Sequence, residues 1–176
     1  MKYWYVLLVK TGCENKVRDI LNKRLDNKYY LAFIPTRTYV YRRKNSSHLK
    51  TKICFPGYVF VESIYDEENF YVKASVVVRT IAEAFCFLNY GRKIDIAMKK
   101  EEVEGLKQLL GESFCIGPSM GVIREGQLVV VRGNMKGMEA KVIKVNRHNR
   151  EAIIEIDVLN EKKRIAVMLE VYKKDK

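Results

Sequence analysis

Residues 129–145, VVVRGNMKGMEAKVIKV, place two glycines and several cations between β-branched runs, a pattern that could bind phosphate. A phosphate-binding P-loop requires G-x-x-x-x-G-K-[ST], but Gly133 and Gly137 stand too close together and Met138 follows the second glycine. The G-x-G-x-x-G fingerprint of dinucleotide sites is also absent. The segment is therefore predicted to be a tight turn between strands, with a basic rim that can contact nucleic acid.

A second basic segment, residues 36–52 (TRTYVYRRKNSSHLKTK), contains no acidic residue. Its six cations are Arg37, Arg42, Arg43, Lys44, Lys50 and Lys52. Charges on an edge hairpin also prevent aggregation, which is the structural alternative. Because six like charges repel one another, a phosphate backbone is the favoured partner.

The whole chain is basic. It has 176 residues and a net charge of +12, and both halves contribute: residues 1–118 carry 20 Lys/Arg against 13 Asp/Glu, and residues 119–176 carry 13 against 8. Clustered cations of this kind favour a polyanionic partner such as nucleic acid. No apolar run approaches the roughly 20 residues that span a bilayer, and MKYWYVLLVKTG lacks a small-residue cleavage site, so a cytoplasmic protein with no membrane contact is expected.

Catalytic and metal-binding patterns are missing. There is no G-x-S-x-G or H-E-x-x-H, and the two histidines, His48 and His148, lie far apart. The four cysteines are scattered, with no C-x-x-C pair, so they are expected to be buried, reduced thiols. The chain is predicted to be a non-enzyme with no metal and no cofactor.

The elements that must position these segments follow from periodicity. Residues 3–9 and the runs 31–43 and 52–62 are β-prone, whereas apolar positions at helical spacing predict helices after Thr11-Gly12, from Asp66 to Ala74, and over 99–110. Residues 75–88 are predicted to be a strand with its connection. The order predicts an α+β, ferredoxin-like split βαβ domain.

Composition then changes. Residues 115–121, CIGPSMG, are typical of a linker, and five short strands are expected after residue 124: 128–132, 139–146, 151–158, 163–168 and 169–172. Five short strands in about fifty residues predict a small SH3-like β-barrel.

Aromatic residues gather near Pro56-Gly57, which interrupts a strand-like run. A bulge or an edge position is expected there, because proline cannot donate to a strand ladder. Phe55 and Tyr58 are three residues apart, so their side chains would point to opposite faces of a regular strand. Only such an irregularity would bring them to one face. If they were exposed together with Trp4, the patch would be a docking surface for an apolar partner.

Three segments together resemble the NusG family of transcription elongation factors: WYVLLVKTGCENKVRDIL (4–21), FPGYVFVE (55–62) and GQLVVVRGNMKGMEAKVIKVN (126–146). They stand in the family's order. The resemblance implies an N-terminal NusG (NGN) domain over 1–113, a linker over 114–123 and a C-terminal KOW domain over 124–176, in a protein expected to be a monomer.

The resemblance also implies partners. The NGN domain would dock on the clamp helices of RNA polymerase through an apolar pocket, matched here by Trp4, Phe55 and Tyr58. Contact with the upstream DNA fork is expected at Lys10, Thr11, Lys73, Arg79, Arg42, Arg43 and Lys44. Holding the clamp closed would disfavour the paused polymerase by differential binding to one conformation.

The KOW segment departs from the family pattern, with Gly133-Asn134-Met135 where Gly-Pro-Phe is usual and Ala140 where glycine is usual. A structured leader RNA hairpin is expected to contact Arg132, Asn134, Lys136, Lys141, Lys144, Arg147, His148, Arg150, Lys162, Lys163 and Arg164. This resembles specialised antiterminators of the LoaP and RfaH type, with LoaP favoured. RfaH-like members switch their C-terminal domain between helix and barrel, whereas the valine and isoleucine content here favours a stable barrel.

The expected function is processive antitermination on a polymerase recruited through the NGN domain. Two alternatives stay open: a housekeeping elongation factor whose KOW domain binds proteins, and a ribosome-associated KOW protein that never contacts polymerase.

Overall fold

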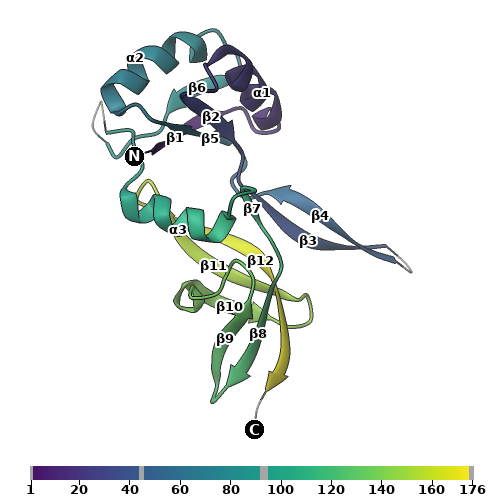
Figure 1. Cartoon of the computed structure of the whole chain (residues 1–176). Helices are drawn as coiled ribbons and strands as arrows, with labels where there is room; N and C mark the ends of the chain where they lie inside the picture. Colours follow the sequence, from purple (N-terminus) through teal and green to yellow (C-terminus); the bar gives the residue numbers. More distant parts are fainter. Residues whose placement is uncertain (1, 44–45, 92–94, 175–176) are drawn as a thin grey trace. The chain divides into compact units, whose positions relative to one another are not determined.

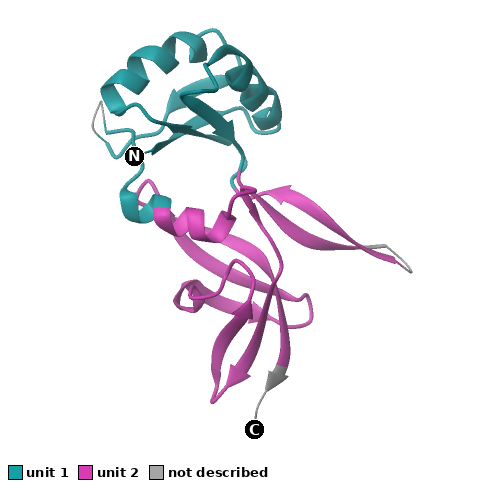
Figure 2. Cartoon of the chain, in the orientation of Figure 1, with its two compact units in different colours: residues 1–34, 55–103 teal, residues 35–54, 104–176 magenta. Residues whose placement is uncertain are grey.

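The computed structural model describes residues 2–43, 46–91 and 95–174; Lys44, expected at the DNA fork, lies outside these ranges. Its contacts divide the chain into two compact units, shown in Figure 2: residues 1–34 with 55–103, and residues 35–54 with 104–176. The division does not follow the expected boundaries at 113 and 124. A division by contacts is not a division by fold, so those boundaries stay a prediction.

Unit 1 is built on a four-stranded antiparallel sheet in the order β2-β5-β1-β6. The strands are β1 (Tyr3–Val9), β2 (Tyr30–Phe33), β5 (Tyr58–Ser63) and β6 (Ala84–Phe87). The helices α1 (Glu14–Arg24) and α2 (Glu67–Val78) lie on one face of this sheet (Figure 1). Tyr5 stacks on Phe70 of α2, with 3.6 Å between ring centroids, and both are fully buried. This pairing anchors α2 on the sheet.

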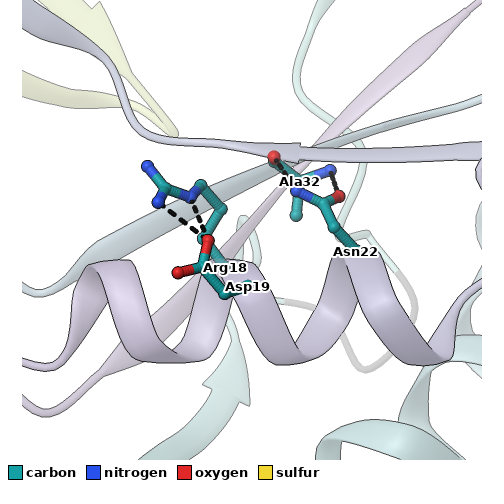
Figure 3. A network of polar contacts seen from close by, with 4 residues as sticks. All are labelled: Arg18, Asp19, Asn22 and Ala32. Atoms are coloured by element: carbon teal, nitrogen blue, oxygen red, sulfur yellow. Dashed lines mark hydrogen bonds and ion pairs between the residues drawn. The ribbon is translucent and has the colours of Figure 1, made fainter.

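A side chain of α1 forms hydrogen bonds to the backbone of the edge strand β2. Asn22 donates its amide Nδ2–H to the carbonyl of Ala32, and its Oδ1 accepts the N–H of Ala32, both at 2.8 Å (Figure 3). The amide therefore mimics a neighbouring strand. Arg18 and Asp19, one turn earlier, form a separate exposed pair at 2.8 Å.

Helix α2 begins as expected and runs further than expected. Asp66 is its N-cap, and the carboxylate accepts the N–H of Asn69 at 3.0 Å. The prediction that residues from 75 onward form a strand is wrong at its start, because the helix continues to Val78. Phe70, Ala74 and Val78 repeat every four residues and are buried, so packing outweighs the β propensity of the valines.

Unit 2 contains a two-stranded ribbon, β3 (Thr36–Arg43) and β4 (Ser46–Ile53), which pairs at its base with β7 (Cys115–Ile116). We call Thr36–Ile53 the β3–β4 ribbon. The expected continuous strand over 52–62 is wrong: β4 ends at Ile53, and a turn closed by the Tyr58 N–H and the Phe55 carbonyl (3.1 Å) precedes β5. Pro56 and Gly57 (φ +84°) occupy the two central positions that proline and glycine favour in type II turns. The third helix, α3 (Lys100–Leu110), crosses the boundary between the units.

The remaining strands of unit 2 form a five-stranded sheet in the order β10-β11-β12-β8-β9. They are β8 (Ser119–Arg124), β9 (Gln127–Arg132), β10 (Val142–Asn146), β11 (Glu151–Val158) and β12 (Glu161–Lys174). Three expectations differ from this arrangement. The stretch read as a linker carries β7 and β8, residues 139–141 form a 3-10 turn (η1, Glu139–Lys141), and residues 163–172 belong to one strand.

One strand replaces the two expected because β12 changes partner along its length. Its first half pairs antiparallel with β11, and Leu169 onward pairs parallel with β8. Alternating burial of Ile165, Val167 and Leu169 continues through the change of partner. Local periodicity cannot reveal this, since both halves present the same period-2 pattern.

The cysteine prediction is partly wrong. All four cysteines are free, as expected, but Cys86 is exposed and Cys13, Cys54 and Cys115 are only partly covered. Burial raises the pKa of the Cys54 thiol to about 12, and Cys115 adds to this while the charge of Arg37 opposes it. Within the described residues, no three His, Cys, Asp or Glu side chains are grouped so as to hold a metal ion. No helix in the described ranges is both long and apolar enough to cross a bilayer.

Candidate functional site

The three residues expected to dock on polymerase belong to one aromatic cluster in unit 1. Phe60 lies 6.3 Å from Trp4 and 5.5 Å from Phe55, and Phe55 stacks on Tyr58 at 6.4 Å, measured between ring centroids. The turn at Pro56-Gly57 thus brings Phe55 and Tyr58 together. Trp4 is fully buried and Phe55 is 4% exposed, whereas Tyr58 is half-buried. Tyr58 is the part of the cluster that reaches the surface.

A buried carboxylate fixes the orientation of Trp4. Glu62 is 8% exposed, accepts the indole N–H of Trp4 at 3.0 Å, and pairs with the ammonium of Lys2 at 2.6 Å. Trp4 and Glu62 are directly opposite each other in the β1–β5 register. Glu62 was not identified from the sequence, although an acidic residue in an apolar strand is a detectable signal because such a group needs a partner.

A second buried carboxylate joins two loops. Glu14, at the start of α1 and 2% exposed, accepts the N–H of Gly12 at 2.8 Å and the N–H of Gly57 at 2.7 Å. Both glycines have positive φ, +89° and +84°. The Val9 N–H also donates to the Gly57 carbonyl at 2.8 Å. Sequence reasoning missed Glu14, for which a glycine followed by an acid in the first helical turn was the available signal.

The two hydrogen bonds that Glu14 accepts, which we call the Glu14 clamp to distinguish it from the polymerase clamp, join the Phe55–Tyr58 turn to the turn at residues 10–12. These are the segments expected to face polymerase and the DNA fork, respectively. A Cβ placed on Gly57 would lie 3.2 Å from the Thr11 hydroxyl, which shows how closely the two turns pack.

The expected DNA-fork residues of unit 1 are all exposed. Lys10 and Thr11 lie beside Glu83, whose carbonyl accepts the Lys10 N–H at 2.8 Å, and Arg79 caps the C-terminus of α2. Lys73 lies six residues earlier on α2, about 9 Å along its axis, with its ammonium 5.2 Å from the ring centroid of Tyr65. Arg42 and Arg43 belong to strand β3 in unit 2.

The loop at 133–138 is shaped by close packing. At Gly133 (φ +102°), an added Cβ would lie 2.5 Å from both the Pro118 carbonyl oxygen and the Ser119 hydroxyl, so only glycine fits. Met135 is fully buried and donates its N–H to Ser119 Oγ at 3.2 Å. Asn134 is half-buried, and its amide oxygen would lie 3.1 Å from a Cβ added at Gly117. Asn134 is thus a packing residue of the turn.

Eight of the other expected RNA-binding residues fall into two groups, and the remaining two, Arg132 at the end of β9 and Lys136 in the loop at 133–138, belong to neither. One group is at the end of the sheet where Glu155 pairs with Arg164: Lys141, Lys144, Lys162, Lys163 and Arg164. The other is the β10–β11 turn with Arg147, His148 and Arg150. Glu151, beside that turn, lies four residues or roughly 13 Å along β11 from Glu155. The two groups are therefore separated along β11, with Lys144, opposite Ile153, midway between them.

Neighbouring carboxylates neutralise part of the first group. Glu155 pairs with Lys162 at 2.9 Å and with Arg164 at 3.2 Å, and these hydrogen bonds hold the pKa of Glu155 below its ordinary value. Lys163 pairs with Glu161 at 2.5 Å, and in the second group Arg150 lies 3.4 Å from Glu170. For Arg132, Lys136, Lys141, Lys144 and Arg147, all exposed, no ion pair is found within the described ranges.

Glu139 joins the edge strand β9 to η1. Its carboxylate accepts the Val130 N–H at 2.9 Å. Burial raises the pKa of this carboxyl, but backbone N–H groups, Val130 among them, outweigh burial and hold it below its ordinary value. The turn that carries Lys141 is thus fixed to the sheet.

Comparison with known proteins gives a consistent family. Residues 2–107 match the family described as "Transcription termination factor nusG". A Streptococcus pyogenes protein named "Transcription termination/antitermination protein NusG" is 27% identical over 154 residues, covering 84% of this chain and 83% of that protein. A Bacillus subtilis protein of the same name is 32% identical over 76 residues, covering 40% of this chain and 43% of that protein.

A solved structure described as "Domain interaction in Thermotoga maritima NusG" is similar over 96% of this chain and 94% of that chain. The TM-score is 0.58 at 20% sequence identity, which supports a shared fold. The mixed α+β prediction, with three helices and mostly sheet in the described residues, agrees with that fold.

Proposed function

Because the chain belongs to the NusG family of transcription termination/antitermination factors, which are not enzymes, we propose that it is a cytoplasmic factor that binds RNA polymerase and a structured RNA. The prediction of a non-enzyme is confirmed by the family. The finer assignment, a specialised antiterminator of the LoaP type, is proposed from the basic character of residues 119–176.

The domain types are part of this proposal. The sheet order β2-β5-β1-β6 of unit 1, with elements in the sequence β-α-β-β-α-β, supports a ferredoxin-like split βαβ NGN domain. Strands β9 to β12 lie within residues 124–176, and β8 (Ser119–Arg124) joins their sheet from the expected linker, so the five strands support an SH3-like KOW barrel that begins before residue 124.

Polymerase docking is assigned to the aromatic cluster of unit 1. Tyr58 is its surface end, and the buried Phe55 and Trp4 support it from beneath. The observation that carries this assignment is the turn at Pro56-Gly57, which stacks Tyr58 on Phe55 and leaves Tyr58 half-buried at the surface. Lys10, Thr11 and Arg79, exposed on the same unit, are proposed to face the upstream DNA.

Co-purification tests the docking surface. Tyr58→Ala should remove RNA polymerase from the material that co-purifies with the protein, while the fluorescence of the single tryptophan, Trp4, stays that of a buried indole. Leu31→Ala, at a 41% exposed apolar position on the edge strand β2, is the matched control and should retain polymerase. Retention of polymerase by the Tyr58 variant would contradict the docking proposal and favour a protein that acts away from polymerase.

RNA binding is assigned to the exposed cations of the KOW segment. Removing one phosphate contact, as in Lys141→Ala, should lower the magnitude of the salt slope by about one unit with little change in specificity. A residue that reads a base edge, such as Arg147, should cost about 1–3 kcal/mol and blur the discrimination between RNAs. Gel shifts of the full chain with a leader hairpin and a scrambled RNA measure both quantities. Equal affinity for the two RNAs at every salt concentration would favour the housekeeping alternative.

A further inference from the structure

The strand register sorts the side chains of the β3–β4 ribbon onto two unlike faces. Directly opposed residues of antiparallel strands share a face, and so do alternate residues of each strand. One face therefore carries three cross-strand pairs: Arg37 with Lys52, Tyr39 with Lys50, and Tyr41 with His48. We call these six residues the ribbon face. The opposite face carries Thr38 with Thr51, Val40 with Leu49 and, nearer the tip, Arg42 with Ser47.

The ribbon face combines cations with accessible aromatic rings. Lys50 holds its ammonium 4.1 Å from the ring centroid of Tyr41, which is 39% exposed. His48, Lys50 and Lys52 are exposed. Successive residues on this face are about 7 Å apart, close to the span of one nucleotide in an extended single strand. Here the two rings lie on β3 and face basic residues on β4, and sequence-tolerant single-strand sites combine stacking rings with cations in this way.

Charge around the ribbon points to the same class of partner. No Asp or Glu occurs between Asp26 and Glu62, so the ribbon itself carries no carboxylate, although Glu151 lies in the groove beside Tyr39. At its base, Arg37 keeps Nη1 buried without a hydrogen-bond partner in the described part of the chain.

A groove connects the ribbon face to the KOW segment. It has a volume of about 260 Å³ and is lined by Tyr39, Val40, Asn149, Arg150, Glu151 and Met168. Tyr39 belongs to the ribbon face, and Arg150 belongs to the β10–β11 turn expected to bind RNA. Segments more than one hundred residues apart in sequence therefore border one groove within unit 2.

We propose that the ribbon face binds single-stranded nucleic acid, stacking bases on Tyr41 and Tyr39 and holding phosphates with Lys50, Lys52 and Arg37. The strand continues through the groove to the β10–β11 turn. This inference deepens the proposed function, on which it rests for the partner class. The chemistry is shared by a nascent transcript and by a displaced DNA strand, so RNA and DNA probes distinguish the sources.

Fluorescence anisotropy of the full chain with a labelled oligouridylate tests the site. Tyr41→Ala should weaken binding about tenfold, within the range of one lost base stack. Lys50→Ala should lower the magnitude of the salt slope, between roughly 50 and 200 mM salt, by about 0.7. Leu49→Ala and Thr51→Ala are the matched controls, because both residues are exposed on the opposite face of the same strand, and binding should be unchanged.

The same proteins are tested with the deoxy form of the probe and with a blunt duplex. Tighter binding of the ribo form identifies the transcript as the occupant, and equal binding of both identifies a site for either strand. Preference for the duplex would overturn the proposal, as would equal weakening by variants of both faces or unchanged binding by every variant. Crosslinks of a bromouridine probe should map to Tyr39 or Tyr41, and crosslinks confined to residues 119–176 would also overturn it.

Binding of a structured RNA hairpin, measured alongside with Lys141→Ala, keeps the two hypotheses separate. Loss of hairpin recognition with oligouridylate binding intact would count against the proposed function alone. Intact hairpin recognition with an inert ribbon face would count against this inference alone.

Discussion

Replacing Glu14 with alanine should loosen two turns at once. The carboxylate accepts the N–H groups of Gly12 and Gly57 at 2.8 and 2.7 Å and is 2% exposed. Gly57 is buried, so its N–H would lose its partner without access to water, whereas the exposed Gly12 can be hydrated. The substitution therefore leaves one orphaned buried donor and one donor that water satisfies.

The magnitude follows from those two contacts. A hydrogen bond to a charged group contributes about 1.5–3 kcal/mol, and an unsatisfied buried donor costs about 1–3 kcal/mol. Removing a buried charge offsets part of the loss. We expect E14A to destabilise unit 1 by about 2–4 kcal/mol. E14Q should cost about half as much, because its amide oxygen can still accept one N–H while its NH₂ group faces the other donor.

Urea unfolding followed by tryptophan emission measures this change in unit 1 alone, because Trp4 is the single tryptophan and is fully buried there. With a urea m-value of about 1–3 kcal/mol/M, the midpoint of E14A should fall by roughly 1–2 M. Amide NMR should show the Gly12 and Gly57 protons moving together in E14Q. Co-purification of polymerase should weaken in parallel with Tyr58→Ala, since the clamp holds the Tyr58 turn.

Glu83→Gln is the matched control. Glu83 is a surface acid that pairs with Lys16 at 2.6 Å, and surface pairs of this kind contribute little to stability, so the midpoint should not change. A urea midpoint of E14A equal to that of the wild type would refute the stabilising role of the Glu14 clamp. Shifts of only one glycine amide in E14Q would show that the two turns are independent.

Three further changes test unit 2. Glu155→Gln should release Lys162 and Arg164 from their ion pairs. Binding of the structured RNA should then tighten, and the magnitude of the salt slope, measured by filter binding, should increase by up to about two units. An unchanged slope would show that neither cation contacts RNA. Glu139→Gln should lower the melting temperature near neutral pH, and the difference from wild type should vanish as pH falls below about 4.5. Folding lowers the pKa of the Glu139 carboxyl. The ionised carboxylate therefore stabilises the folded protein at pH values above the pKa of the unfolded chain, and this stabilisation is lost as the pH falls through the pKa of the folded protein. Gly133→Ala should destabilise unit 2 by about 2–4 kcal/mol, whereas Gly126→Ala, at φ +82° with open space around it, should cost only about 1 kcal/mol; equal melting temperatures by circular dichroism would contradict the close-packing argument.

The sequence predicted those elements whose periodicity is local. The strand Tyr3–Val9 and the Asp66 cap are found where expected, because apolar alternation and capping chemistry act within a few residues. Strand β8 was missed because Gly117-Pro118-Ser119 has linker composition, and only pairing with β9 and β12 makes the segment that follows a strand. Long-range pairing overrides composition in that segment.

For the candidate site, the sequence predicted residue types better than their exposure. Trp4, Phe55 and Tyr58 do lie together, but the burial of Trp4 depends on Phe33, Phe60 and Glu62, which lie more than twenty residues away in sequence. The clamp of Glu14 was not predicted because it needs Gly57, 43 residues away. The sequence contains Glu14, Gly12 and Gly57, but it does not show that they are hydrogen-bonded in the fold.

The ribbon allows its two explanations, protection against aggregation and binding, to be weighed. β4 is an edge strand that is exposed along Ser46–Lys52, so burial of β4 does not account for its eight paired residues. Protection against aggregation requires charge on the free edges but neither a single sign of charge nor accessible rings. Surface charge that serves solubility is normally of mixed sign, whereas the cations here share one face with two tyrosines. A face that places cations of one sign beside two tyrosine rings is better explained by a polyanion with stackable bases.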